Sequence, residues 1–170
     1  MTKVDSAHCG VDKMVIKTNE NFGGDTVTYS VHHVTVDGRI YYRESLADSD
    51  DPIDRNISIL GFGERFFRYQ EAWAIRQLML KLKDQDLTVR RRAMDEILAC
   101  FDFSRGFFPE KRVAFLQNPS YSAVLSNLHL AVADYCAGRG VPSTQINAVR
   151  NLQDLLVSTL EGRDGGSTAS

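Results

Sequence analysis

The chain has 170 residues, 43% of them hydrophobic, which is enough for one compact domain with a real core. Its formal net charge of -2 excludes a protein that is basic throughout and binds nucleic acid or membranes through bulk charge. No apolar run reaches the roughly 18 residues of a membrane span, and the first residues lack the basic and apolar regions of a signal peptide.

The three cysteines, Cys9, Cys100 and Cys136, form no CxxC pair. Cys100 and Cys136 fall in segments of helical periodicity, where a thiol packs as a small apolar group. An odd number of unpaired cysteines favours a reducing compartment over a disulfide framework. We therefore expect a cytoplasmic protein, and a nuclear location stays open.

The N-terminal part predicts β structure. Residues 11–17 are rich in Val, Met and Ile, and two β-branched and aromatic runs, 26–36 and 39–43, flank Asp37-Gly38. This dipeptide is favoured in type I′ turns, because both of its positions tolerate positive φ. We expect an antiparallel β-hairpin or a three-stranded meander over residues 1–45.

Residues 46–60 contain four aspartates and Pro52, and predict a solvated acidic connector. Helical periodicity starts after it. Gly61 and Gly63 are interpreted as a turn before one long helix, 64–83, whose apolar residues on more than one side include Phe67 and Trp73 as core residues.

Further helical segments follow over residues 88–101, 109–116, 121–137 and 144–160. The sequence thus predicts an α+β fold in which the β region precedes a bundle of four or five helices over residues 61–161. A disordered tail is expected over residues 162–170, where glycine and small polar residues dominate.

Residues 82–87 form a short charged turn between two segments of helical periodicity. Because the turn is so short, the two helices must run antiparallel. Asp86 or Thr88 is expected to cap the second helix, and Asp84 and Asp86 neutralise its positive N-terminus. Small Ala93 allows the two helices to approach closely. We expect Asp84, Asp86 and Arg90 to be the structural residues of this turn.

The same residues match the pattern L-x-D-x-D-x-x-V-R-x-x-A at Leu82, Asp84, Asp86, Val89, Arg90 and Ala93. Residues 74–101 therefore resemble one helical hairpin of the HEAT-type repeat family. The resemblance implies that Arg90 pairs with a neighbouring turn aspartate. A solenoid needs at least about three repeats, and residues 109–137 are a candidate second pair without the same motif. We expect an ordinary helical bundle that uses the same local contacts, with a true relative of the repeat proteins as the alternative.

No group of residues in the sequence has the types and spacing of a catalytic site. His32 and His33 are adjacent and would point to opposite faces of a strand, and the aspartates of residues 48–54 lack the spacing of a calcium-binding loop. Gly61-Phe-Gly63 lacks the third glycine of a dinucleotide-binding motif. No aspartate or serine lies at a spacing from His129 that would indicate a catalytic pair. We expect no enzyme activity and no catalytic, metal-binding or cofactor-binding residues.

The strongest functional signal is the middle of the chain. Residues 61–116 carry 11 basic and 8 acidic groups, interleaved with aromatic residues. Eight of the basic residues are candidate interaction residues: Arg65, Arg68, Arg76, Arg91, Arg92, Arg105, Lys111 and Arg112. The first hypothesis is a non-enzymatic adaptor or regulatory protein that binds a protein partner through helical surfaces around residues 65–112.

The alternative hypothesis is a small RNA-binding regulatory protein of the kind that compact viral genomes encode, with phosphates held by these cations and bases stacked on the aromatic rings. A homodimer or higher oligomer stays open, and no membrane partner is expected.

Overall fold

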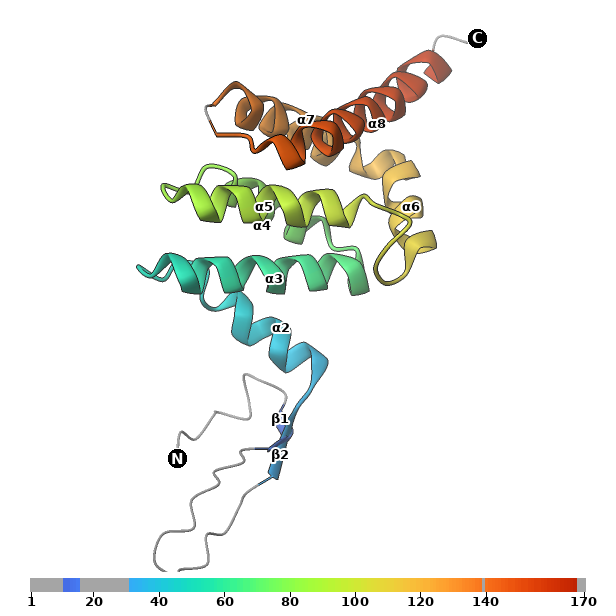
Figure 1. Cartoon of the computed structure of the whole chain (residues 1–170). Helices are drawn as coiled ribbons and strands as arrows, with labels where there is room; N and C mark the ends of the chain where they lie inside the picture. The colour runs from blue at the N-terminus through green and yellow to red at the C-terminus, as the bar shows by residue number, and fades with distance from the viewer. Residues whose placement is uncertain (1–10, 16–30, 139, 168–170) are drawn as a thin grey trace, which may run out of the picture.

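The computed structural model describes residues 11–15, 31–138 and 140–167 (Figure 1). In these ranges the chain forms seven α-helices: α2 (Val36–Glu44), α3 (Pro52–Tyr69), α4 (Ala72–Lys81), α5 (Leu87–Cys100), α6 (Pro109–Gln117), α7 (Ser122–Ala137) and α8 (Ser143–Ser167). One turn of 3-10 helix, η1 (Pro119–Tyr121), precedes α7. α8 continues through residues 162–167, which were expected to belong to a disordered tail.

The predicted α+β class is wrong, because the part of the chain that the structure describes builds its core from helices. The described residues contain only a short antiparallel pairing of β1 (Val11–Val15) with β2 (Val31–Val34), and no sheet on which helices pack. The hydrophobic core comes from the helices and their connections. Within the predicted β region, residues 1–10 and 16–30 lie outside the described residues.

The predicted hairpin around Asp37-Gly38 is also wrong, because these two residues lie in the first turn of α2. The side chain of Thr35 accepts a hydrogen bond from the amide of Gly38 at 3.0 Å and caps the helix. Asp37 is favourable beside the positive helix N-terminus. Ile40 is fully buried in this helix. Capping and burial thus outweigh the β preference of the flanking residues.

The acidic connector predicted for residues 46–60 ends early, because the chain is helical from Pro52 onward. Asp51 caps α3 by accepting a hydrogen bond from the amide of Ile53 at 2.9 Å, and Pro52 occupies the first helical turn. Gly61 and Gly63 therefore lie inside α3 rather than in a turn before it.

The long helix predicted over residues 64–83 is two helices. Gln70 adopts the left-handed conformation, with φ of 49°, and ends α3. Its side-chain amide donates to the carbonyl of Phe67 at 2.7 Å, which helps to satisfy the end of the helix. Because glycine and asparagine are the usual residues in this conformation, the sequence gives no signal of the break.

The helices form three antiparallel hairpins, α2–α3, α4–α5 and α7–α8, that are stacked in chain order (Figure 1). The second helices form one layer, because α3 packs on α5 and α5 packs on α8; α4 packs on α7 in the other layer. α6 and η1 connect the second hairpin to the third, and α6 lies at the side of the stack, beside the C-terminal end of α5 (Figure 1). The HEAT-like segment, residues 74–101, is the central hairpin.

Two glycines of α3 allow this close stacking. A Cβ atom at Gly61 would lie 2.8 Å from Cβ of Arg43 and 3.0 Å from the backbone nitrogen of Glu44, both in α2. A Cβ atom at Gly63 would overlap the side chain of Glu96 in α5. Residues two apart in a helix point about 200° apart, so these glycines admit two different neighbours on opposite sides of α3.

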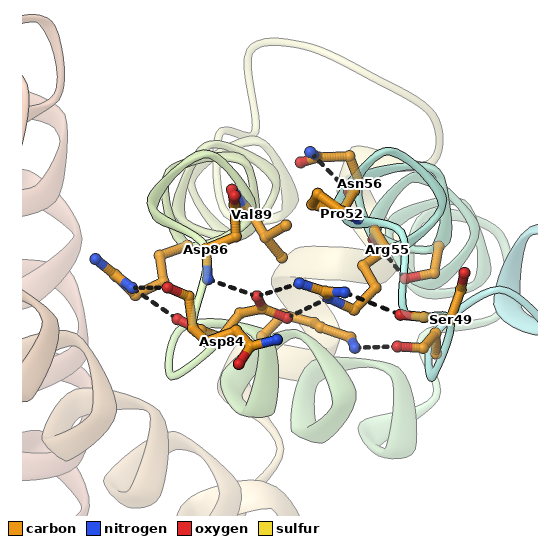
Figure 2. Close-up of polar contacts among 12 residues, drawn as sticks. Ser49, Pro52, Arg55, Asn56, Asp84, Asp86 and Val89 are labelled. Atoms are coloured by element: carbon orange, nitrogen blue, oxygen red, sulfur yellow. Dashed lines mark hydrogen bonds and ion pairs between the residues drawn. The ribbon is translucent and has the colours of Figure 1, made fainter.

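A buried ion pair joins the first hairpin to the turn of the second (Figure 2). Arg55 donates through Nε and Nη2 to the two carboxylate oxygens of Asp84, at 2.9 and 3.1 Å, and each side chain is only 8% exposed. Arg55 also donates to the carbonyls of Ser49 and Asp50. Burial alone would raise the pKa of Asp84, but the hydrogen bonds that its carboxylate accepts from Arg55 and from the amide of Asp86 lower it below its usual value.

Of the two predicted capping residues, Asp86 and not Thr88 caps α5, accepting from the amides of Thr88 and Val89 at 2.8 and 3.1 Å (Figure 2). Arg90 does not pair with a turn aspartate. It donates instead to the carbonyls of Asp84 and Gln85, at 2.7 and 3.2 Å. The Asp84 carboxylate is occupied by Arg55, which comes from a helix that the local motif does not include.

None of the helices in the described ranges combines the length and the apolar composition needed to cross a lipid bilayer.

Candidate interaction groove

The α3, α5 and α8 layer carries three adjoining hollows, which together we call the interaction groove. The first, of about 320 Å³, lies among α2, α3 and α5, and contains Glu64 and Glu96. The second, of about 530 Å³, lies among α3, α5 and the start of α8. The third, of about 330 Å³, lies between α5 and α8. The first and second hollows share Phe67 and Gly106, and the second and third share Leu98, Arg105 and Ala148, so the three hollows follow one another along the stack.

Residues 102–108, which we call the Phe loop, border all three hollows and display two exposed aromatic rings. Phe107 is 57% and Phe108 40% exposed. Phe108 has a φ of 54°, a left-handed conformation that a bulky residue adopts only under strain. Arg68 lies over the ring of Phe107 at 4.9 Å, and Lys111 lies over that of Phe108 at 4.7 Å.

The side chain of Arg112 holds the Phe loop in place. It is completely buried. Its guanidinium donates to the loop carbonyls of Asp102, Arg105 and Phe107, and to the carbonyls of Ala99 and Cys100 at the end of α5. It also stacks on Phe67 at 4.7 Å. Burial lowers its pKa from the usual arginine value. Arg112 is therefore a structural residue and cannot contact a partner directly.

Arg65 has a similar internal role. It donates through Nε and Nη2 to the carboxylate of Glu44 at 2.7 and 2.6 Å, and its side chain is 11% exposed. It also pairs with Glu71 and lies near the rings of Tyr41 and Trp73, at 5.1 and 5.6 Å. The predicted contact residue Arg65 thus joins α2, α3 and α4 to one another.

The remaining predicted cations lie in separate places. Arg91 donates to the carbonyl of Gly140 at 2.8 Å, and Arg105 pairs with Asp102 at 2.7 Å at the surface. Arg76 and Arg92 are exposed on α4 and α5. Only Arg68, Arg105 and Lys111 border the Phe loop or the groove. The eight residues do not form one continuous basic surface, although all of them were predicted as a set.

The structure adds residues that the sequence did not single out. Arg39 and Arg43 of α2 border the first hollow with Glu64 and Glu96. Phe107 and Phe108 were not recognised, although two aromatic residues between Gly106 and Pro109 cannot belong to a helical stripe, and that mismatch is a readable signal. Trp73, expected in the core, is 45% exposed and packs edge-to-face with Phe62.

The two carboxyl groups of the first hollow differ in charge state. Burial alone would raise the pKa of Glu64, but hydrogen bonds from Arg39 and Arg68 lower it. Burial raises the pKa of Glu96 to about 7, against the opposing effect of Arg92 and Arg43. Glu64 is thus ionised at neutral pH, whereas Glu96 is divided between its neutral and ionised forms.

Other candidate sites are not assembled. The described residues contain no group of three or more His, Cys, Asp or Glu side chains placed to share a metal ion. Burial raises the pKa of the Cys100 thiol, which keeps it protonated and unreactive. The side chains of His32 and His33 lie outside the described residues, and Nδ1 of His129 is buried without a hydrogen-bond partner among those described. No protein-family model, curated protein or solved structure matches the chain.

Proposed function

We propose that this chain is a non-enzymatic interaction protein that binds a partner protein along the interaction groove. The proposal rests on the groove, whose three adjoining hollows are lined by residues of all three hairpins and bordered by an ordered loop with two exposed phenylalanines. Aromatic and arginine side chains dominate the binding energy of protein interfaces. A loop that is already ordered loses little entropy on binding.

The stack also supports a HEAT-type scaffold, with residues 74–101 as its central unit. On one side of this unit α8 packs on α5 and α7 packs on α4, and on the other side α3 packs on α5, so that three hairpins, the number a solenoid needs, follow one another. Solenoids commonly bind partners along the surface formed by one layer of helices. We place this function in the cytoplasm, where the free thiols of Cys100 and Cys136 would stay reduced.

A protein partner fits the charges better than RNA does. The groove mixes Arg39, Arg43 and Arg105 with Glu64 and Glu96, instead of presenting one continuous positive track. Two of the cations expected to bind phosphates, Arg65 and Arg112, have their guanidinium groups engaged inside the protein. RNA binding without sequence preference depends on a basic groove that follows the backbone.

The test is a comparison of captured partners. Tagged wild-type protein, Phe107→Glu and Leu130→Glu would each be used to capture proteins from cells, followed by mass spectrometry. Phe107 and Leu130 are similarly exposed, at 57% and 60%, but Leu130 lies on α7 and does not border the groove. We expect one partner set to be retained by wild type and Leu130→Glu and depleted at least about tenfold by Phe107→Glu.

Equal capture by all three proteins would contradict the groove as the binding surface. Recovery of RNA that decreases steeply between about 50 and 200 mM salt, without a protein that depends on Phe107, would favour the RNA-binding alternative.

A further inference from the structure

Three arginines converge on one carboxylate in the first hollow of the groove. Arg39 donates to Glu64 through Nε at 3.1 Å and through Nη2, and Arg68 donates through Nε at 3.1 Å. Arg43 lies 3.6 Å from the same carboxylate. The guanidinium groups come from two helices, α2 and α3. Their positive charge exceeds the single negative charge that Glu64 supplies.

Most of the donors in this cluster remain available. A guanidinium has about five N–H donors. Arg39 uses Nε and Nη2, and Arg68 uses Nε. Among the described residues, the guanidinium of Arg43 makes no hydrogen bond. The Glu64 side chain is 13% exposed, whereas those of Arg39 and Arg43 are 41% and 32% exposed. The carboxylate is therefore less accessible than the arginines that it holds, and Arg39 and Arg43 themselves line the hollow.

We infer that this hollow is a pocket for a carboxylate side chain from an acidic segment of the partner protein. The inference rests on the proposed function and specifies the chemistry of the partner. Arginine forks bind carboxylates through paired, charge-assisted hydrogen bonds. A hollow of about 320 Å³ with walls formed by Phe67 and Phe107 suits one side chain of a peptide that continues along the groove.

Glu96 modulates the pocket. Its charged neighbours are Arg92 and Asp95 on α5 and Arg43 on α2, and Glu64 of α3 borders the same hollow. When Glu96 is ionised it repels an incoming carboxylate, and when it is protonated this repulsion is absent. Acidic peptides should therefore bind more tightly at pH 6 than at pH 8.

The probe is a fluorescent decaglutamate peptide, measured by fluorescence anisotropy with the full chain at about 50 mM salt. Decaglutamine and a glutamine peptide with one phosphoserine are the comparison probes. We expect decaglutamate to bind, decaglutamine to fail, and Arg43→Gln to weaken decaglutamate binding about tenfold. Arg76→Gln, an equal change of charge at an exposed position of α4, should leave the affinity unchanged.

Glu96→Gln separates recognition from a structural effect, because it should tighten binding at pH 8 and have little effect at pH 6. Circular dichroism of each variant verifies folding. Absence of decaglutamate binding, or equal losses in Arg43→Gln and Arg76→Gln, would overturn the pocket. Binding of the phosphoserine peptide alone would overturn a carboxylate as the ligand. If Phe107→Glu still removed the captured partners in any of these cases, the proposed function would stand and only the acidic ligand would fail.

Discussion

At the scale of single residues, the carboxyl group of Glu96 links folding to pH. Its pKa of about 7 in the folded protein lies above the usual 4.5. Between these two values the folded chain retains a proton that the unfolded chain releases, so the free energy of unfolding decreases as pH rises through this window. Above pH 7 the full destabilising effect is present.

We therefore expect Glu96→Gln to be more stable than wild type by about 2–3 kcal/mol at pH 8, and the difference to vanish near pH 4.5. Urea denaturation at the two pH values measures it. Glu161→Gln, a change at an exposed position of α8 beyond its first turn, is the control and should have little effect at either pH. A stabilisation of equal size at both pH values would indicate improved packing instead of loss of a buried charge.

The roles of individual cations were the least predictable part of the candidate site. Arg65 and Arg112 have the same residue type and helical setting as exposed Arg76, yet they are enclosed by the fold. Arg112 binds backbone carbonyls, which every residue has, so its partners leave no mark in the sequence. Asp86 was predictable because a helix cap depends only on residues two and three positions ahead.

At the scale of helices, substitution of each of the two glycines of α3 is expected to have a different effect on stability. Gly63→Ala should destabilise the protein by about 1–3 kcal/mol, because the added methyl group displaces the side chain of Glu96. Truncation of that side chain in Glu96→Ala should remove most of this effect, which a double-mutant cycle measures by chemical denaturation.

Gly61→Ala is the matched comparison. Its added methyl group meets Cβ of Arg43 and the backbone of Glu44, which no side-chain truncation at residue 96 relieves. Its destabilisation should therefore be the same in the wild-type and Glu96→Ala backgrounds. Equal coupling of both glycines to Glu96 would contradict the assignment of their neighbours.

The helices α5, α7 and α8 were predictable from their periodicity. The end of α3 and the helical state of α2 were not, because they depend on contacts that the periodicity does not show. The end of α3 at Gln70 uses a left-handed residue with no glycine signal. The segment of α2 contains residues of high β propensity, and its helix is specified by the Thr35 cap and by packing against α3. A single sequence shows the local preference, but not the neighbour that overrides it.

At the scale of the whole molecule, Gln145 connects the second hairpin to the third. It is 3% exposed. Its amide group donates to the carboxylate of Asp95 and to the carbonyl of Arg91, at 2.6 and 3.0 Å, and its oxygen accepts from the hydroxyl of Tyr135 at 2.6 Å. One side chain thus bonds to groups from α5 and α7 at the start of α8.

We expect Gln145→Leu to destabilise the protein by about 1–3 kcal/mol, because it removes the three hydrogen bonds that this buried side chain makes. The loss of stability should be confined mainly to the third hairpin. Amide hydrogen exchange should accelerate more in α7 and α8 than in α3, because stacked hairpins are stabilised mainly by their nearest neighbours. Uniform acceleration across all three hairpins would show that the stack opens as one cooperative unit.

The buried guanidinium of Arg112 has a consequence for the kinetics of association. Because one side chain already binds three carbonyls of the Phe loop, a partner meets Phe107 and Phe108 in positions that need little rearrangement. Complex formation then follows rigid-body docking, with an observed rate that rises linearly with partner concentration and no slow ordering step after the encounter.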